Sequence, residues 1–589
     1  MAFAAPVADI AFWLRTVAGL DEDLAAGVFP DLSADLVDAV LAEAGRFATD
    51  EIAPLNVLGD REGARFENGA VTMPAAWKPV FERWVEGGWT ALDGDPEYGG
   101  QGLPVMLYAA TLEMWNAAST AFATGPMLTA GAIEALSAHG SAEQKATYLP
   151  KLIAGTWTGT MNLTESQAGS DLGPMRTRAE PVGDGSYRIT GQKIFITYGD
   201  HDLTDNIVHL VLARLPDAPA GTRGISLFVV PKFLVGADGS LGARNAAGPV
   251  GIEHKLGIHA SPTCVMQFDG AVGWLVGEPN RGLAAMFTMM NSARMSVGVQ
   301  GVGVAERAYQ RALAYALDRR QGRAPGWTGE GLSPIVHHPD VKRMLLTMRA
   351  QTDVARALCF SLARAIDRGR TGPEEARAAF AERAALLTPI AKAFATDTGV
   401  EVASLGVQVH GGMGYIEETG AAQHLRDARI LTIYEGTNGI QAIDLVTRKL
   451  TLRGGEVVSA WLAELGAIAR EALAVGEADL GERVEAALAD LAGATHALQR
   501  ALAEGRGTDA LAGATAYLRL AALAAGGAYH LAAVLADRAA GTATPAAARR
   551  LAVARFYATD ILPQTGGLAA AATAGGAVLV GVTPDILTA

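Results

Sequence analysis

One acidic residue stands between an apolar approach and a loop of small residues, in the order Thr432-Ile433-Tyr434-Glu435-Gly436-Thr437-Asn438-Gly439. Glycines in such a loop permit close approach of the backbone. We expect the Glu435 carboxylate to leave a buried element and to be poorly solvated, which raises its pKa and suits it to remove a proton from a substrate. A helix-capping or loop carboxylate is the alternative that this stretch alone leaves open.

A second group of residues suits the binding of a flat polar ligand. Residues 162–172 read N-L-T-E-S-Q-A-G-S-D-L, and residues 191–197 read G-Q-K-I-F-I-T. A loop rich in Thr, Ser and Gly presents backbone amides and hydroxyls without bulk, as hydrogen bonding to a heterocycle or a pyrophosphate requires. Each of these residues taken alone is better explained as an ordinary strand or turn residue.

The elements that carry these residues change character along the chain. Apolar residues recur at helical spacing up to about residue 152, short segments rich in β-branched and aromatic residues follow from 157 to 268, and helical periodicity returns at about 283. We predict a mostly α, α+β protein with four domains: an N-terminal helical domain (1–156), a barrel-like antiparallel β domain (157–282), a helical bundle carrying Glu435 (283–455) and an extra C-terminal helical domain (456–589). No G-x-G-x-x-G follows a predicted strand, which disfavours a Rossmann dinucleotide site.

Composition limits the kinds of partner. The 589 residues carry a net charge of -14, which argues against a general nucleic-acid or membrane-surface binder but leaves room for a local arginine pocket. The two cysteines, Cys264 and Cys359, have apolar neighbours and are expected to be buried reduced thiols; no metal site is predicted. The N-terminus has no basic region typical of a signal peptide, and the longest weakly polar run, 568–582, is shorter than the ~20 residues that span a bilayer. We therefore predict a cytoplasmic protein.

Taken together, the motifs resemble those of the acyl-CoA dehydrogenase family of flavoproteins over about residues 35–450. The stretch 434–437 resembles the Y-E-G-T segment of the catalytic glutamate. Residues 164–171 resemble the T-E-P-x-A-G-S-D flavin loop, with Ser166 in place of the usual proline, and 191–197 resemble the strand that follows it. Residues 408–414 resemble the Q-x-x-G-G-x-G segment. Four motifs in the family's order are a far more specific signal than any one of them.

The resemblance implies a set of cofactor and substrate contacts. FAD is the implied cofactor, with Phe195 packed on its isoalloxazine and its other contacts supplied by Thr164, Thr197, Ser170 and Thr437. Ser170 lies where the family contacts cofactor or CoA. Arg319 matches the arginine that pairs with the FAD pyrophosphate of a neighbouring subunit, together with Gln408, Gly411 and Gly412. Arg294 resembles an arginine beside the acyl-CoA; a solvated helix residue is the alternative there.

The reaction implied is α,β-dehydrogenation of an acyl-CoA thioester. Glu435 would remove the α-proton while the β-hydride passes to the flavin, giving a trans-2-enoyl-CoA, and an electron-transfer flavoprotein would accept the electrons. Asn438 and Gly439 depart from the family pattern and are expected to widen the space beside the base.

The extra domain after residue 455 resembles that of long-form members, including those that act on 3-methylmercaptopropionyl-CoA, and implies a homodimer. A broad-range fatty acyl-CoA dehydrogenase, an acyl-CoA oxidase and a non-enzymatic helical scaffold are the alternatives.

Overall fold

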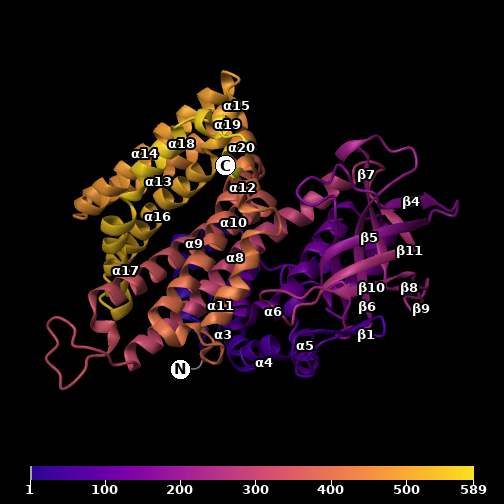
Figure 1. Ribbon diagram of the computed structural model, residues 1–589, viewed down its shortest axis with the longest axis horizontal. Helices are drawn as coiled ribbons and strands as arrows, with labels where there is room; N and C mark the ends of the chain where they lie inside the picture. The colour runs from indigo at the N-terminus through magenta and orange to yellow at the C-terminus, as the bar shows by residue number, and fades with distance from the viewer. Residues whose placement is uncertain (1–2) are drawn as a thin grey trace. The chain divides into compact units, whose positions relative to one another are not determined.

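The computed structural model describes residues 3–589, so the first two residues of the predicted N-terminal domain lie outside it. The described chain forms two compact units (Figure 1). The helical unit comprises Met1–Gly45, Val105–Ala117 and Val297–Ala589, and the β unit comprises Arg46–Pro104 and Ala118–Ser296. The long helices α6 (Val105–His139) and α8 (Gly282–Asp318) contribute residues to both units.

A seven-stranded sheet forms the centre of the β unit. Strand β11 pairs with β5, β5 with β4, β4 with β6, β6 with β7, and β7 returns to β11, so these strands close into a ring; β10 and β3 extend it. The strands are β3 (Trp157–Asn162), β4 (Arg178–Pro181), β5 (Tyr187–Thr197), β6 (Asn206–Arg214), β7 (Ile225–Pro231), β10 (Ala247–Ile252) and β11 (Thr263–Val276). Two short hairpins, β1–β2 (Arg65–Glu67, Ala70–Thr72) and β8–β9 (Phe233–Val235, Leu241–Arg244), accompany it.

The side-chain pattern of the strands explains where the core lies. Strands β6 and β7 are buried along nearly their whole length, and their apolar runs suit positions covered on both faces. Their side chains pack with Ile189, Ile196 and Phe268 around the interior. The predicted antiparallel domain is confirmed for most pairs. The pair β3–β6 is parallel, as is a single-residue contact between β4 and β6, because these strands are joined through crossovers and not through hairpins. Helices α4 (Leu55–Glu62), α5 (Trp77–Glu86) and α7 (Ala142–Ile153) complete the unit.

Long helices form the centre of the helical unit. They are the later part of α8, α9 (Pro339–Thr371) and α10 (Glu374–His410), joined by the short helices α1 (Val7–Phe12), α2 (Leu20–Ala25), α11 (Ala421–Ala428) and α12 (Asn438–Asp444) and by most of α3 (Ala34–Phe47). Gly301 lets α8 approach α10 closely, since a Cβ there would lie 2.3 Å from the carbonyl oxygen of Ala395. The absence of a side chain at Gly301 therefore permits the close spacing of α8 and α10.

The chain after residue 455 folds as helices that pack on α9 and α10, as the yellow and orange ribbons of Figure 1 show. They are α13 (Glu456–Ala474), α14 (Ala478–Ala503), α15 (Gly507–Ala512), α16 (Ala514–Ala539), α17 (Pro545–Phe556), α18 (Gln564–Thr573), α19 (Ala577–Gly581) and α20 (Pro584–Thr588). Two ion pairs join them to α10: Arg519 to Glu401 at 2.5 Å and Arg383 to Glu464 at 2.6 Å. The predicted C-terminal helices are confirmed.

Helix α16 combines length with an apolar composition. In residues 3–589 it is the one helix long and apolar enough to cross a membrane, but 89% of its most apolar window is buried inside the protein. Such burial is typical of a core helix. The longest apolar run therefore lies in α16, whereas the run expected at 568–582 is divided between α18 and α19.

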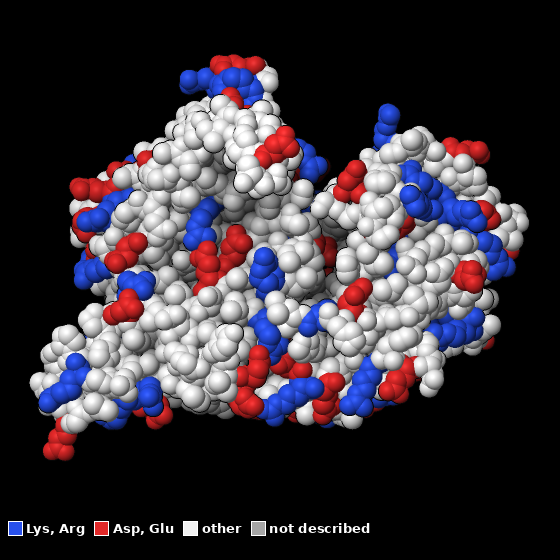
Figure 2. Space-filling model, viewed as in Figure 1, with Lys and Arg blue, Asp and Glu red and all other residues white. Residues whose placement is uncertain are grey.

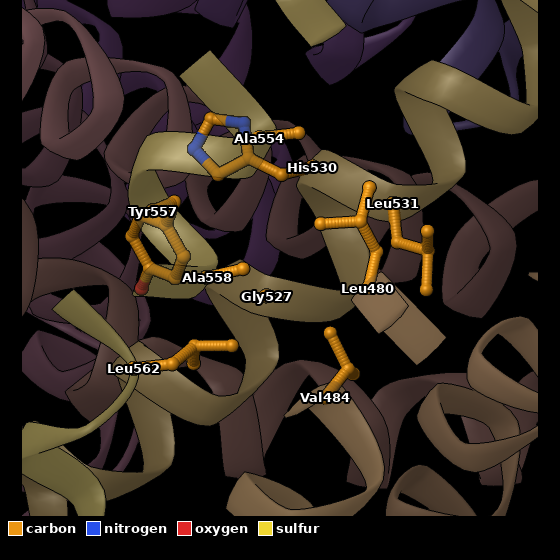
Figure 3. A pocket seen from close by; sticks show the side chains of 9 residues that line it. All are labelled: Leu480, Val484, Gly527, His530, Leu531, Ala554, Tyr557, Ala558 and Leu562. Carbon is orange, nitrogen blue, oxygen red and sulfur yellow. The ribbon is translucent and has the colours of Figure 1, made fainter. Parts of the chain in front are cut away.

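A small cavity lies in the core of these C-terminal helices (Figure 3). Its volume is about 10 Å³, roughly the space that one water molecule needs. The polar groups at its wall are satisfied elsewhere, since the Tyr557 hydroxyl donates to the carbonyl of Leu523 and His530 Nε2 lies 3.1 Å from the carbonyl of Ala350. The cavity is lined by Leu480, Val484, Gly527, His530, Leu531, Ala554, Tyr557, Ala558 and Leu562. It is a packing void, far too small for an acyl chain.

Candidate active site

The structure brings the predicted flavin-contacting segments of the β unit together. The Ile194 amide donates to the carbonyl of Thr164 at 2.9 Å, so the loop after β3 lies along β5. Thr197 ends β5 opposite Thr263 of β11. The side chains of Thr164 and Thr197 are half-buried, whereas Ser170 lies on an exposed part of the loop. Two hydroxyls and an aromatic ring thus stand close together on one strand and its neighbouring loop.

Phe195 has an unusual backbone for a strand residue. Its φ is 61°, in the left-handed region that non-glycine residues rarely enter, and its side chain is 59% exposed. The register of β5 against β11 shifts at this position, between the pairs Met266–Lys193 and Cys264–Ile196. Bulges of this kind redirect a side chain out of the alternating pattern of a strand. The ring is consequently offered to the outside, available for stacking on a flat ligand.

An ion pair that the sequence analysis did not single out lies behind the flavin-type loop. The Lys193 ammonium is fully buried and lies 2.9 Å from Glu165 Oε1. The same carboxylate accepts hydrogen bonds from the backbone amides of Arg176 and Thr177, from the Thr177 hydroxyl and from the Gln167 side chain. Glu165 thus holds both ends of the loop between β3 and β4.

The surroundings of this ion pair shift the pKa values of both residues. Burial alone would raise the pKa of Glu165, but the charge of Lys193 and the hydrogen bonds from Thr177 and Arg176 outweigh it and lower that pKa to about 2. Burial lowers the pKa of Lys193 to about 8, with Glu165 opposing the shift. Both residues belong to the motifs quoted above, but Glu165 stands among polar loop residues, so the sequence around it gave no signal of a buried ion pair.

In the helical unit, Glu435 lies in a tight connection between two helical segments. The turn η9 (Arg429–Thr432) precedes it and α12 follows. Its φ is 55°, again in the left-handed region, and the residue is half-buried. Thr437, and not Glu435, caps α12, because its side chain accepts a hydrogen bond from the Ile440 amide at 3.3 Å. The capping alternative for Glu435 is therefore wrong.

The residues around Glu435 are tied into the interior. The Tyr434 hydroxyl donates to Gln300 Oε1 on α8, and burial, together with the neighbouring Glu435 charge, raises the pKa of this phenol. The Gln441 amide lies 3.3 Å from the carbonyls of Glu435 and Gly436. The Lys392 ammonium donates to the Gly436 carbonyl at 2.9 Å. The backbone that carries the Glu435 carboxylate is therefore held at several points.

The two residues that depart from the family pattern have different surroundings. The Asn438 side chain turns toward α10, where its amide donates to Asp397 at 2.7 Å and its oxygen accepts from Lys392 at 2.9 Å. Gly439 is exposed, and a Cβ there would meet only the Thr437 hydroxyl, at 3.9 Å. Asn438 therefore anchors α12, and any extra space comes from Gly439.

Four further predicted contacts lie on the surface of the helical unit. Arg319, Gln408, Gly411 and Gly412 are all exposed. Their segments meet through the rings of Tyr315 and His410, whose centroids are 4.4 Å apart. In the part of the chain that the structure describes, no ion pair is recorded for Arg319, and a Cβ on either glycine would meet open space. These exposed residues are accessible to a ligand that approaches from solvent.

Arg294 lies on the part of α8 that belongs to the β unit. Its side chain is 6% exposed, its Nη1 donates to Asn291 at 3.3 Å, and its guanidinium lies 5.9 Å from the centre of the Phe287 ring. The alternative of a solvated helix residue is therefore wrong.

Charge and metal-binding groups place further limits on ligands. On the face shown in Figure 2, basic side chains are interspersed with acidic ones. Among residues 3–589, no three His, Cys, Asp or Glu side chains come together in a way that could hold a metal ion.

Comparison with known families gives four consecutive matches. They are the acyl-CoA dehydrogenase N-terminal domain at residues 36–156, the middle domain at 160–271, the C-terminal domain at 280–450, and a domain described as acetyl-CoA dehydrogenase C-terminal like at 456–583. The last of these covers the helices from α13 onward.

Individual relatives agree with these matches. The 3-methylmercaptopropionyl-CoA dehydrogenase of Ruegeria pomeroyi is 52% identical over 504 residues, covering 85% of this chain and 86% of that protein. Among solved structures, ACDH-11 of Caenorhabditis elegans in complex with C11-CoA superposes with a TM-score of 0.78 at 22% identity, over 95% of this chain and 91% of that one. An acyl-CoA dehydrogenase from Bacillus anthracis complexed with FAD gives a TM-score of 0.73 at 21% identity, over 100% and 94% of the chains.

Proposed function

The chain belongs to the acyl-CoA dehydrogenase family and is an FAD-dependent oxidoreductase of acyl-CoA thioesters, and we propose that Glu435 is its catalytic base. The observation that carries this proposal is the fixed, left-handed backbone of Glu435 on a half-buried loop. Strained non-glycine residues persist where the surroundings over-determine them, and they cluster at active sites. A carboxylate in such a place can remove the weakly acidic α-proton of a thioester.

The residues of the β unit fit the flavin ring of FAD. We propose that Phe195 packs on the isoalloxazine, and that the hydroxyls of Thr164 and Thr197 hydrogen bond to its polar edge, with Ser170 and Thr437 as further contacts. The exposed ring of Phe195 and the two half-buried hydroxyls beside it support this assignment. Bound FAD supplies the acceptor for the β-hydride. The chain itself supplies the base and the hydrogen bonds that orient the substrate, and Arg294 is proposed to lie beside the acyl-CoA.

We propose that the protein is a homodimer in which each subunit completes the FAD site of the other. A guanidinium fork matches a pyrophosphate well, and Arg319 is exposed without a recorded ion pair in the described chain. Gln408 and the open glycines Gly411 and Gly412 are the proposed companions of Arg319. The same segments expose apolar side chains, namely Leu317, Met413, Tyr415 and Ile416. Exposed apolar side chains gathered in this way mark protein interfaces.

The proposed substrate is 3-methylmercaptopropionyl-CoA, by similarity to the Ruegeria pomeroyi enzyme. The proposed electron acceptor is an electron-transfer flavoprotein. A broad-range fatty acyl-CoA dehydrogenase is the second candidate, favoured by the open space at Gly439. The predicted division at residues 156, 282 and 455 is kept as a proposal, supported by the ends of the family matches.

The deciding experiment is anaerobic reduction of the purified yellow protein by a panel of acyl-CoAs. Loss of flavin absorbance with 3-methylmercaptopropionyl-CoA, at a rate well above that with butyryl- or palmitoyl-CoA, would support the proposed substrate. Faster reduction by long chains would favour the second candidate, and no reduction by any acyl-CoA would exclude the reaction. Peroxide formation in air that matched dye-linked turnover would indicate an oxidase.

A further inference from the structure

Lys392 is a charged residue in an unusual place. It lies on α10 with its side chain fully buried, and lysines are almost never fully buried unless paired. Its ammonium donates to the carbonyl of Gly436 and to Asn438 Oδ1, both at 2.9 Å. Both acceptors belong to the three residues that follow Glu435. This buried charge is therefore directed at the loop of the proposed base.

Asn438 links Lys392 to a carboxyl group. The side-chain amide of Asn438 donates to Asp397 Oδ1 at 2.7 Å and to the carbonyl of Ala393 at 3.1 Å. Burial raises the pKa of Asp397, and the hydrogen bond from Asn438 partly offsets this. Because both ends of the Asn438 amide are engaged, the orientation of this side chain toward α10 is fixed. The first residue of α12 is thus held against α10 by charge-assisted hydrogen bonds.

The position of these contacts matters for Glu435. A left-handed backbone at a non-glycine residue costs on the order of 1–3 kcal/mol, so the surrounding structure must hold it. On the N-terminal side, the Tyr434 hydroxyl is tied to Gln300. On the C-terminal side, the planar peptide after Gly436 is oriented by the Lys392 bond to its carbonyl. Glu435 lies between these two anchors.

We propose that Lys392, acting with Asn438, is a positioning residue that holds Glu435 in its working geometry. The proposal rests on the proposed function, in which Glu435 is the base. A bond from a charged donor to a carbonyl is about twice as strong as a neutral one, which explains a lysine at a site where a leucine would fill the same space. A misplacement of about 1 Å in a catalytic group costs on the order of 100-fold in rate.

The test compares Lys392→Met with the wild-type holoenzyme. Methionine keeps an unbranched side chain but removes the ammonium. With the flavin already reduced and unable to accept hydride, deuterium exchange at the α-carbon of an acyl-CoA in D2O reports the base alone. Spectral perturbation of the oxidised flavin by a 2-enoyl-CoA reports binding. We expect the exchange rate to fall about 10- to 100-fold, with the enoyl-CoA Kd and the FAD content within about threefold of wild type. Asn438→Ala keeps the Lys392–Gly436 bond, so its exchange rate should fall by a smaller factor than that of Lys392→Met.

Controls separate this proposal from the function on which it rests. Lys449→Met, at a lysine 3.9 Å from Asp444 in the same unit, should exchange like wild type. Wild-type exchange that is lost in Glu435→Gln but kept in Lys392→Met would overturn the positioning role alone. Equal losses of FAD, binding and exchange in Lys392→Met would reduce Lys392 to a structural residue. If Lys392→Met does not fold, unchanged exchange in Asn438→Ala overturns the proposal.

Discussion

The Lys193 ammonium and the Glu165 carboxylate form a buried ion pair, 2.9 Å apart, between β5 and the loop that follows β3. Lys193 stands two residues before Phe195, and Glu165 directly follows Thr164. The pair therefore connects the two segments that carry the proposed flavin contacts. Breaking a buried pair by removing one partner is strongly destabilising, because the remaining charge is left uncompensated.

Stability should depend on pH through Glu165. The pKa of Glu165 is about 2 in the folded protein, against 4.5 for an unperturbed glutamate. The ionised carboxylate therefore stabilises the fold above about pH 4.5, and this stabilisation is lost as the pH falls toward 2. We expect Glu165→Gln to lower the temperature of flavin release at pH 7, and the gap to wild type to narrow between pH 5 and pH 3. Glu180→Gln, at an exposed glutamate of the same unit, should release its flavin at the same temperature as wild type. A gap that stays constant with pH would contradict the assignment.

The base itself can be tested at Glu435. Glu435→Gln keeps the shape and removes the basic oxygen, so we expect retained FAD and a loss of flavin reduction of at least about 100-fold. Glu435→Asp should retain part of the rate, because the shorter carboxylate still ionises. Stopped-flow reduction by the best acyl-CoA measures both. The exposed Glu418→Gln is the matched control, and near-normal reduction in Glu435→Gln would remove Glu435 from the role.

A comparison of variants at Arg319 and at its neighbour Arg320 distinguishes a specific contact with the cofactor from a general effect of positive charge. Arg320 donates to the carbonyl of Leu332 at 3.1 Å, whereas Arg319 is exposed without a recorded ion pair in residues 3–589. We expect Arg319→Ala to weaken FAD binding by at least about 10-fold through loss of the proposed bidentate phosphate contact, with the sedimentation of the protein unchanged. Arg320→Ala should keep its flavin. Equal FAD content in the two variants would be evidence against the cross-subunit contact.

The order of helices, sheet and helices was predictable because periods of 3.6 and 2 residues are local properties of the sequence. The flavin-type loop and the strand after it were predictable from their residue types. Other features depend on contacts between distant residues. Lys392 lies 44 residues before Gly436, and a lysine on a helix is ordinarily a surface residue, so no local pattern marks it as buried. The positive φ of Phe195 arises from a shift of register against β11, which the sequence of β5 alone does not contain.

The choice of acyl chain can be probed at Gly439. Its φ is not positive, it lies near the start of α12, and its surroundings are open, so a side chain is tolerated there without backbone strain. If the space beside Glu435 accommodates the acyl chain, Gly439→Leu should slow flavin reduction by long acyl-CoAs at least about 10-fold more than reduction by short ones, because a filled pocket rejects added methylenes. The thermal midpoint should stay the same or rise slightly, since glycine in a helix costs about 0.5–1 kcal/mol relative to alanine. Gly493→Leu, on an exposed and open position of α14, is the matched control and should leave the chain-length profile unchanged. An equal effect of Gly439→Leu on every chain length would show that Gly439 lies away from the acyl chain and that selectivity is set by other residues.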